Sequence, residues 1–143
     1  MCIRDSLHGL YEVQIFDSWD STEPLTSSDC GGIYHRWIDN HGVGGSAPSR
    51  NACRRPGEWQ TYDILWEAPR FDADECVRPA RVTVLLNGVV VHHAKELMGP
   101  TRHRQTTAYE PHPETGPLML PDHGDLVRFR NIWYRPLTGY DEG

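Results

Sequence analysis

The sequence has no run of Lys or Arg, no long apolar stretch and no closely spaced pair of cysteines. Its formal charge is -6 at pH 7 and its pI is about 5.7, so it lacks the positive surface that binds nucleic acid or an anionic membrane. No apolar run approaches the roughly 18 residues that span a bilayer, and the first residues lack the apolar core of a signal peptide. A neutral partner is therefore the more natural one.

The four cysteines are Cys2, Cys30, Cys53 and Cys76, and no two of them form a Cys-x-x-Cys pair. This spacing does not support a zinc knuckle or a thioredoxin-type site. Two of the last three cysteines could pair in an oxidising compartment, and free buried thiols are the equal alternative.

No segment has the period of an amphipathic helix, and none is repeated. The stretch LYEVQIFD (10–17) instead alternates, with Tyr11, Val13 and Ile15 on one face and Glu12 and Gln14 on the other. This period of two predicts a half-buried strand. Two polar side chains would then share one face of that strand.

Three further segments also read as strands. EWQTYDILWEAPRF (58–71) predicts a strand ended by Pro69, because proline supplies no donor to a strand ladder. ARVTVLLNGVVVHHA (80–94) predicts a hairpin, because Asn87-Gly88 suits a tight type I′ turn. DLVRFRNIWYRPL (125–137) alternates apolar and basic residues and predicts a last strand.

The remaining chain is rich in Gly, Pro, Ser, Asp and Asn, which predicts long loops at 18–55, around a short strand at 31–37, and at 99–117. With 143 residues, 38% of them hydrophobic, the chain suits one globular domain. Short strands with long connections predict an all-β sandwich or barrel.

The first six residues, MCIRDS, resemble a translated sequencing adapter of the kind met at the start of metagenomic reading frames. We therefore predict that residues 1–6 are an artefact and exclude them from fold reasoning. Residues 7–143 would then be the C-terminal part of a single longer domain.

Six blocks occur in a fixed order along the chain: GLYEVQIFDS, CGGIYH, PGEWQTYDI, VTVLLNGVVVH, GPLMLPDHG and VRFRNIWYRPL. In this order they resemble the 3-keto-disaccharide hydrolase domain family, also known as domain of unknown function 1080. Leu118 and Pro121 stand where the family usually has Ile and Gln. The resemblance implies a concanavalin A-like jelly roll, a sandwich of two curved antiparallel sheets with the ligand on the concave face. The family domain is longer at its N-terminus, so early strands are expected to be missing.

The resemblance also implies a substrate, a glycoside whose sugar has been oxidised at carbon 3 by a separate dehydrogenase. The ketone acidifies the C2–H bond, so a base can start an elimination that expels the C1 substituent, and water then adds to the product. Ordinary glycosidases instead use a carboxylate pair around an oxocarbenium-like transition state. The site needs a base near C2, a group that stabilises an enolate and a donor for the leaving oxygen.

We predict that Glu12, Asp122 and His123 are the catalytic residues. The ordinary pKa of histidine, about 6.5, suits proton transfer near neutrality. Asp122 would orient His123 or bind a cation, and Gly124 would let the backbone bend beside them. The structural alternatives are a simple turn at Asp122-His123 and a solvated sheet face at Glu12.

Substrate contacts are predicted from polar groups near Glu12 and from aromatic rings beside the glycine-rich loop, because an aromatic plane stacks on a sugar ring. Trp59 and Trp66 lie inside a predicted strand and are expected in the core. The predicted substrate-binding residues are Gln14, Asp17, Tyr34 and Trp37.

A divalent cation is a further candidate, bound through Glu12, Asp122 or His123. His92 and His93 are neighbours in a predicted strand, so they point to opposite faces and cannot share one metal. Arg130 and Asn131 are expected to be structural and to tie the last strand to its neighbour.

The favoured function is an enzyme that cleaves 3-keto-glycosides in carbohydrate catabolism, downstream of a 3-dehydrogenase. A non-catalytic, lectin-like carbohydrate-binding module is the alternative, because jelly rolls of this shape serve both functions. A truncated product without activity is the third reading. The family is usually exported, often as a lipoprotein, which implies a periplasmic or extracellular location.

Overall fold

The computed structural model describes residues 11–34, 36–38, 41–43, 45–103, 108–120, 122 and 124–139, and for 36–38, 41–43 and 102–103 only the backbone. Within these ranges the regular secondary structure consists of strands, without a helix, which confirms the all-β class. A helix able to cross a membrane is accordingly not found in the described residues.

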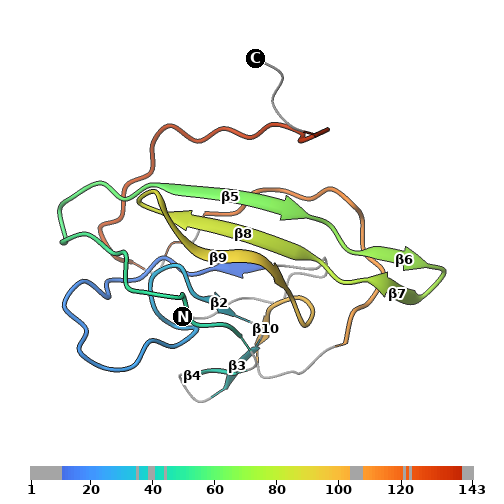
Figure 1. The fold of residues 1–143 in the computed structure, drawn as a ribbon, viewed down its shortest axis with the longest axis horizontal. Coiled ribbons are helices and arrows are strands. Elements are labelled where there is room, and N and C mark those ends of the chain that lie inside the picture. Colours follow the sequence, from blue (N-terminus) through green and yellow to red (C-terminus); the bar gives the residue numbers. More distant parts are fainter. Residues whose placement is uncertain are drawn as a thin grey trace.

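The central sheet contains β5 (Tyr62–Glu67), β8 (Arg81–Leu86) and β9 (Val89–Glu96), antiparallel and in the order β5-β8-β9 (Figure 1). The β8–β9 hairpin is the one predicted from Asn87-Gly88, whose φ angles are 54° and 78°. The Asn87 side chain also accepts a hydrogen bond from the amide of Thr61 (2.9 Å). One residue therefore forms the turn and fixes the chain that enters β5.

A second hairpin extends the sheet at one end. β5 ends before Ala68 and Pro69, as predicted, and the chain continues into β6 (Arg70–Asp72) and β7 (Glu75–Arg78). These two strands pair with each other and project beyond the sheet (Figure 1).

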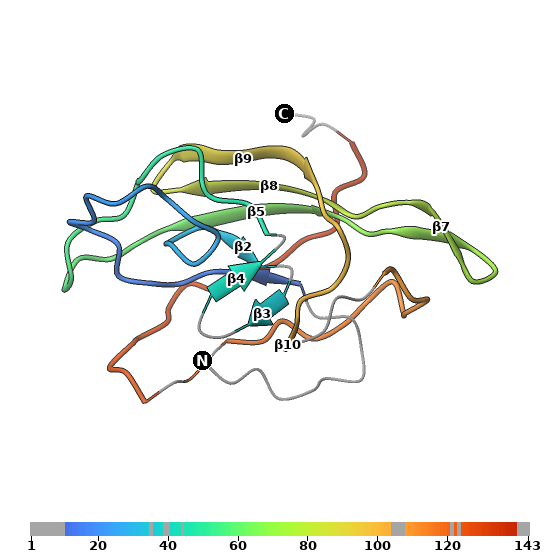
Figure 2. The same cartoon turned by 90° about the horizontal axis from the view of Figure 1, so that it is seen from below.

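A second layer lies against one face of the central sheet (Figure 2). It contains the antiparallel pair β1 (Glu12–Val13) and β2 (Ile33–Tyr34). It also contains a sheet of β10 (Arg102–His103), β3 (Arg36–Ile38) and β4 (His41–Val43), in the order β10-β3-β4. The two layers confirm a sandwich, but β10 pairs with β3 in parallel, so the expectation of purely antiparallel sheets was wrong for this pair.

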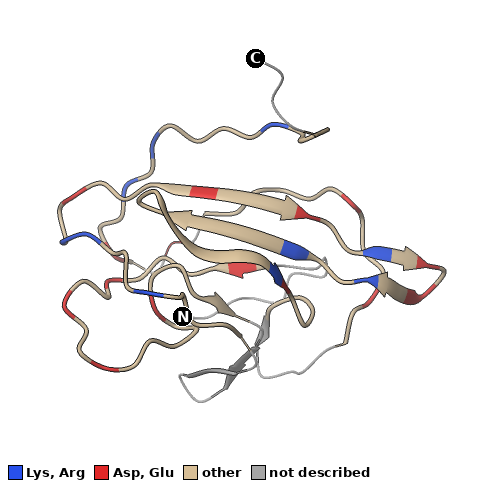
Figure 3. Cartoon of the chain, in the orientation of Figure 1, with Lys and Arg blue, Asp and Glu red and all other residues tan. Residues whose placement is uncertain are grey.

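The hydrophobic core lies between the layers. Alternate residues of β8 (Val82, Val84 and Leu86) are fully or almost fully buried and pack with Val91 of β9 and Ile33 of β2. Period-two alternation therefore places one face of β8 in the core, as expected for a sheet covered on that side. Acidic and basic residues are interspersed over the remaining strands and loops (Figure 3).

The predicted last strand is absent, because residues 124–139 form no ladder with any described segment. Their large side chains are exposed: Phe129 by 37%, Val127 by 51% and Tyr134 by 89%. An alternating pattern becomes a strand only where a neighbouring strand supplies hydrogen bonds, and no described strand pairs with this segment. Arg130 does tie the segment to the fold, since its guanidinium lies 3.7 Å from the centroid of the Trp59 ring.

The expected core positions of Trp59 and Trp66 were also wrong, since these residues are 42% and 39% exposed. Trp59 precedes β5 and packs under Arg130. Trp66 lies opposite Val82 on the core-facing side of β5, but β5 is an outer strand of this sheet, and the Trp66 ring packs against Tyr11, with 4.6 Å between ring centroids. The strand that forms, β5, includes Trp66 but begins after Trp59, and the place of β5 at the side of its sheet leaves the Trp66 ring partly exposed.

Candidate active site around Glu12

The pairing of β1 with β2 builds a compact polar cluster. Glu12 lies directly opposite Tyr34 in the antiparallel register, so the two side chains share a face. Gln14 follows two residues later on that face, and its amide Nε2 donates to the Tyr34 hydroxyl (2.9 Å). Gln14 and Tyr34 are buried, at 6% and 3% exposure. The predicted polar face exists, and the alternative of a solvated face was wrong.

Glu12 carries the unusual electrostatics of the cluster. One carboxylate oxygen, Oε2, is inaccessible to solvent and has no hydrogen-bond partner among the described residues. Burial raises the pKa of the Glu12 carboxyl from 4.5 to about 7, because the ionised form loses hydration. A carboxylate with such a pKa is suited to proton abstraction near neutral pH.

Tyr34 is held from several sides. Burial raises the pKa of its hydroxyl, and the nearby charge of Glu12 adds to this effect. The Thr101 hydroxyl donates to the Tyr34 carbonyl (2.7 Å), which joins the cluster to the segment that follows β9. The Tyr62 hydroxyl donates to the Gln14 carbonyl (3.0 Å), which joins it to β5. Both layers therefore fix the positions of the polar side chains.

A cleft of about 110 Å³ adjoins Tyr34. Its wall includes Ile33 and the Gly45-Ser46 segment, and residues 95–99 form the opposite part of the lining. A side chain at Gly45 would not fit, because a Cβ there would lie 2.0 Å from the Ile33 carbonyl oxygen. The cleft is smaller than the roughly 300–1,000 Å³ of a typical ligand pocket.

The predicted turn at Asp122 exists but lies apart from this cluster. Asp122 is exposed, and its Oδ1 accepts a hydrogen bond from the Gly124 amide (2.9 Å), where Gly124 has a φ of 82°. This is the turn that the structural alternative describes. No contact in the described part of the chain joins Asp122 to Glu12, and His123 lies outside the described residues.

The other predicted binding residues are placed only in part. Asp17 is exposed and its Oδ1 accepts a hydrogen bond from the Trp19 amide (3.3 Å). The backbone of Trp37 belongs to β3, but its side chain lies outside the described residues. The structure thus brings Glu12, Gln14 and Tyr34 together and leaves Asp17 at a local turn.

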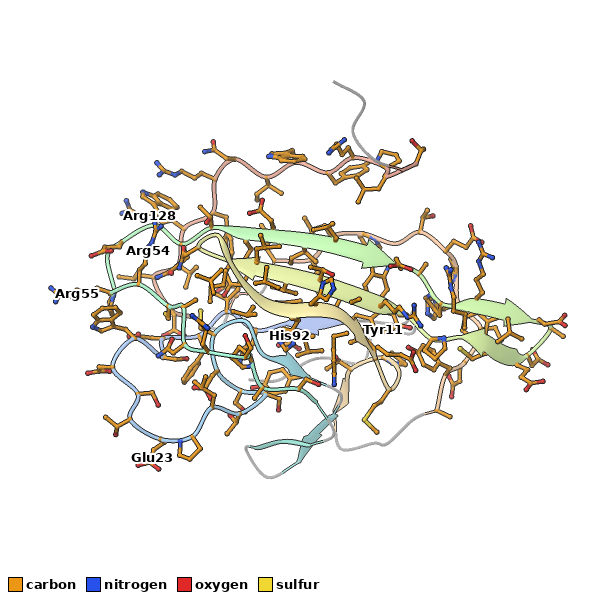
Figure 4. All side chains as sticks on the ribbon, viewed as in Figure 1. Tyr11, Glu23, Arg54, Arg55, His92 and Arg128 are labelled. Atoms are coloured by element: carbon orange, nitrogen blue, oxygen red, sulfur yellow. The ribbon has the colours of Figure 1, made fainter. Side chains whose placement is uncertain are left out.

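The histidines and cysteines form no metal site among the described residues, where no three His, Cys, Asp or Glu side chains converge. His92 is buried in the middle of the molecule, with Nε2 2.9 Å from the Gly31 carbonyl oxygen, whereas His93 is exposed (Figure 4). Their opposite orientation was predicted correctly. Cys30, Cys53 and Cys76 are free thiols.

Sequence reasoning missed residues at the end of β9 and directly after it. Lys95 lines the cleft and Thr101 bonds to Tyr34, yet neither was a candidate. One signal was available, because Lys95 is the single lysine in the sequence. The position of the cleft depends on packing between the layers, which no local pattern encodes.

Comparison with known proteins supplies the family. The family model of the 3-keto-alpha-glucoside-1,2-lyase-like domain matches residues 4–135. A solved structure from Parabacteroides distasonis, provisionally assigned as a glycosyl hydrolase, is 32% identical with a TM-score of 0.58. The similarity covers 73% of this chain and 40% of that chain.

No curated protein matches the chain at a significant level. The family model nevertheless covers most of the sequence, and the six ordered blocks resemble the same family. The chain therefore belongs to the 3-keto-alpha-glucoside-1,2-lyase-like domain family.

Proposed function

We propose that this domain cleaves 3-keto-glycosides, with Glu12 as the base that removes the proton from C2. The observation that carries the proposal is the half-buried Glu12 carboxylate, whose pKa is raised to about 7 and whose Oε2 has no hydrogen-bond partner in the part of the chain that the structure describes. The C2–H bond beside a ketone is acidic enough for such a base, whereas an unoxidised glycoside offers no comparable proton. Family membership supports the substrate class.

The proposed reaction has three steps: removal of the C2 proton, elimination of the C1 substituent and addition of water. Glu12 takes the C2 proton, and the electron pair moves through C2 to the C3 oxygen. The electron pair then returns to form a C1–C2 double bond, and the C1 substituent leaves with a proton from a donor. Water adds at C1 to complete hydrolysis. We propose His123 as that donor, oriented by Asp122, on the sequence evidence given above.

Gln14 and Tyr34 would position the sugar beside Glu12. The Tyr34 ring is 3% exposed, so we propose contact through its hydroxyl, which Gln14 already holds, and not through ring stacking. Asp17 and Trp37 remain proposed as outer contacts with the sugar.

A carbohydrate-binding module is the second candidate, favoured by the aromatic surface of Trp66. This ring is 39% exposed and is supported by Tyr11, whose hydroxyl bonds to His112 Nε2 (2.8 Å). A supported, exposed aromatic ring is a suitable surface for a sugar. Such a module would bind the glycoside without turnover.

We also propose that residues 7–143 are the C-terminal part of a jelly-roll domain. The support is the uncovered apolar side chains of 124–139, such as Trp133 at 72% exposure, together with the greater length of the Parabacteroides relative. Further strands would cover these side chains. We place the whole protein in the periplasm or outside the cell, as the family resemblance implies.

The test compares 4-nitrophenyl 3-keto-glucosides, both anomers, with their unoxidised parents, for this chain and for an N-terminally extended one. We expect nitrophenol release from a keto substrate alone, and its loss in His123→Ala with binding retained. Release from the parent would identify an ordinary glycosidase instead. Binding without any release would favour the carbohydrate-binding module.

A further inference from the structure

Two of the cysteines, Cys30 and Cys53, meet in the interior of the fold. They are 2% and 8% exposed, and both belong to the cluster of buried residues that forms the hydrophobic core. Cys30 precedes β2, and residues 31–52 separate it from Cys53. Their approach is therefore a product of the tertiary structure and not of their sequence spacing.

Ser18, which is itself buried, holds the backbone on both sides of this pair. Its hydroxyl oxygen accepts a hydrogen bond from the Cys30 amide (2.8 Å), and its carbonyl oxygen accepts one from the side-chain amide of Asn51. The Asn51 side-chain oxygen in turn accepts a hydrogen bond from the Cys53 amide (3.1 Å). Both cysteines are thus fixed against one residue.

The two thiols also lie beside each other. Burial raises the pKa of the Cys53 thiol to about 11, and the Cys30 thiol adds to this effect through its charge and through a hydrogen bond between the two side chains. Cys30 Sγ lies 3.0 Å from the Tyr62 hydroxyl oxygen, and the charges of both thiolates contribute to the raised pKa of Tyr62, which burial dominates. A side-chain hydrogen bond joins only neighbouring atoms, so the two sulfurs are neighbours in the core.

The surroundings of the pair tolerate the loss of both thiol protons. The Tyr62 hydroxyl donates to the Gln14 carbonyl (3.0 Å), so in its contact with Cys30 the thiol is the donor. The Cys53 thiol donates to the Arg54 carbonyl (3.5 Å), which also accepts a side-chain amide of the same loop (2.8 Å). A disulfide would therefore leave no buried donor without its acceptor, which is the costly case.

We propose that Cys30 and Cys53 form an intramolecular disulfide when the chain folds in an oxidising compartment, such as the periplasmic or extracellular location proposed above. One cysteine thiolate attacks a disulfide donor, for example oxidised glutathione, and releases one reduced thiol. The second thiolate then attacks the mixed disulfide, closes the Cys30–Cys53 bond and releases the second thiol. The protein loses two protons and two electrons, and the donor gains them. Because burial shields both sulfurs and keeps the Cys53 thiol protonated, the bond forms during folding, before the core closes.

The cross-link would brace the candidate site. The closed loop, residues 31–52, contains Tyr34 and the Gly45-Ser46 wall of the cleft. Ile33 and Ser46 already pair through two backbone hydrogen bonds (3.0 and 2.9 Å), and the disulfide would hold both ends of the same loop in the core. Cys76 is a matched control, because it lies in the β6–β7 hairpin opposite Phe71, and no contact within the described ranges joins it to the pair.

The first test refolds the whole chain from urea, once with oxidised glutathione and once with dithiothreitol. We expect the oxidised protein to be lighter by about 2 Da, the mass of two hydrogen atoms. Trypsin cuts after arginine, so it should release the peptides 5–36 and 51–54 joined by a bond that reduction breaks. The peptides recovered separately, with free thiols, would overturn the proposal, and so would either cysteine joined to Cys2 or Cys76.

A second test asks whether the bond fits the native fold. A cross-link that closes a loop of this length should raise the melting temperature of the oxidised chain by about 5–10 °C over the reduced one. Cys30→Ala and Cys53→Ala should each abolish this difference, and Cys76→Ala should retain it. The oxidised and reduced forms are compared within each protein, so a lower stability of a variant does not affect the result. Equal melting temperatures for the two forms of the wild type would overturn the proposal.

Discussion

The β1–β2 pair differs from the C-terminal segment 116–139, although both contain alternating apolar and polar residues and a carboxylate predicted to be catalytic. In the first region the alternation became a hydrogen-bonded strand whose polar face is covered, so Gln14 and Tyr34 are buried. In the second region the same alternation is left extended and exposed, as at Tyr134. A local pattern indicates a strand, but a neighbouring strand decides whether one forms and which side chains lose water.

The two carboxylates show the chemical consequence. Within the described ranges, Glu12 has an inaccessible oxygen without a hydrogen-bond partner, whereas Asp122 Oδ1 accepts a hydrogen bond from the Gly124 amide at an exposed turn. Desolvation without compensation favours the protonated form. The environment of Glu12 therefore suits a carboxylate that acts as a base near neutral pH.

The largest expected contrast is between Glu12→Gln and Asp122→Asn. Loss of a general base typically lowers kcat by about 100- to 10,000-fold, and we expect Glu12→Gln to fall in that range with the keto substrate. Asparagine preserves a side-chain acceptor for the Gly124 amide but removes the charge that would orient His123, so Asp122→Asn should lower kcat less than Glu12→Gln does. Equal losses in the two variants would place both carboxylates in the chemistry.

The core contrast compares Leu86→Ala with Trp133→Ala. Leu86 is fully buried, so its truncation should lower the free energy of unfolding by about 2–5 kcal/mol. Trp133 is 72% exposed, and its truncation should change stability by less than about 0.5 kcal/mol. Urea denaturation followed by far-UV circular dichroism measures both. A large loss in Trp133→Ala would mean that the C-terminal segment is covered in solution.

The pH dependence of stability isolates Glu12. Its pKa is raised from 4.5 to about 7 on folding, so between these values the folded chain retains a proton that the unfolded chain has lost. The free energy of unfolding should therefore fall as pH rises through this range, by up to about 3 kcal/mol at about 1.36 kcal/mol per pKa unit. Glu12→Gln should lack this contribution.

Comparing the wild type with Glu12→Gln also removes the contribution of His92 to the pH dependence of stability. Burial lowers the pKa of His92, so its contribution has the opposite sign and weakens the fold as pH falls through its ordinary pKa of 6.5. The difference between wild-type and variant titrations retains only the Glu12 contribution. Parallel curves for wild type and Glu12→Gln would show that Glu12 titrates normally.

The smallest contrast compares two tyrosines. Tyr34→Phe removes the acceptor of the buried Gln14 amide and should destabilise the fold by about 1–3 kcal/mol. Tyr134→Phe, at a side chain 89% exposed, should leave thermal stability unchanged. An unchanged melting temperature in Tyr34→Phe would indicate that water replaces the lost bond.

Local signals predicted several elements because their causes are local. Asn87-Gly88 adopts positive φ angles readily, and Pro69 cannot continue a ladder, so the β8–β9 hairpin and the end of β5 were predicted correctly. Glu12 and Gln14 were placed on one face by the period of a strand. Tyr34, which covers that face, lies twenty positions after Gln14 in the chain, so the period of β1 did not predict the contact.

By itself, the sequence determined the all-β class, the family, the central hairpin and the polar face of β1. Only the tertiary structure decided that Glu12 is desolvated, that residues 124–139 form no ladder with a described strand, and that Lys95 and Tyr34 line one cleft. The physical reason is the range of the interactions. Backbone preference and side-chain period act within a few residues, whereas burial and charge depend on segments that meet only when the two layers pack.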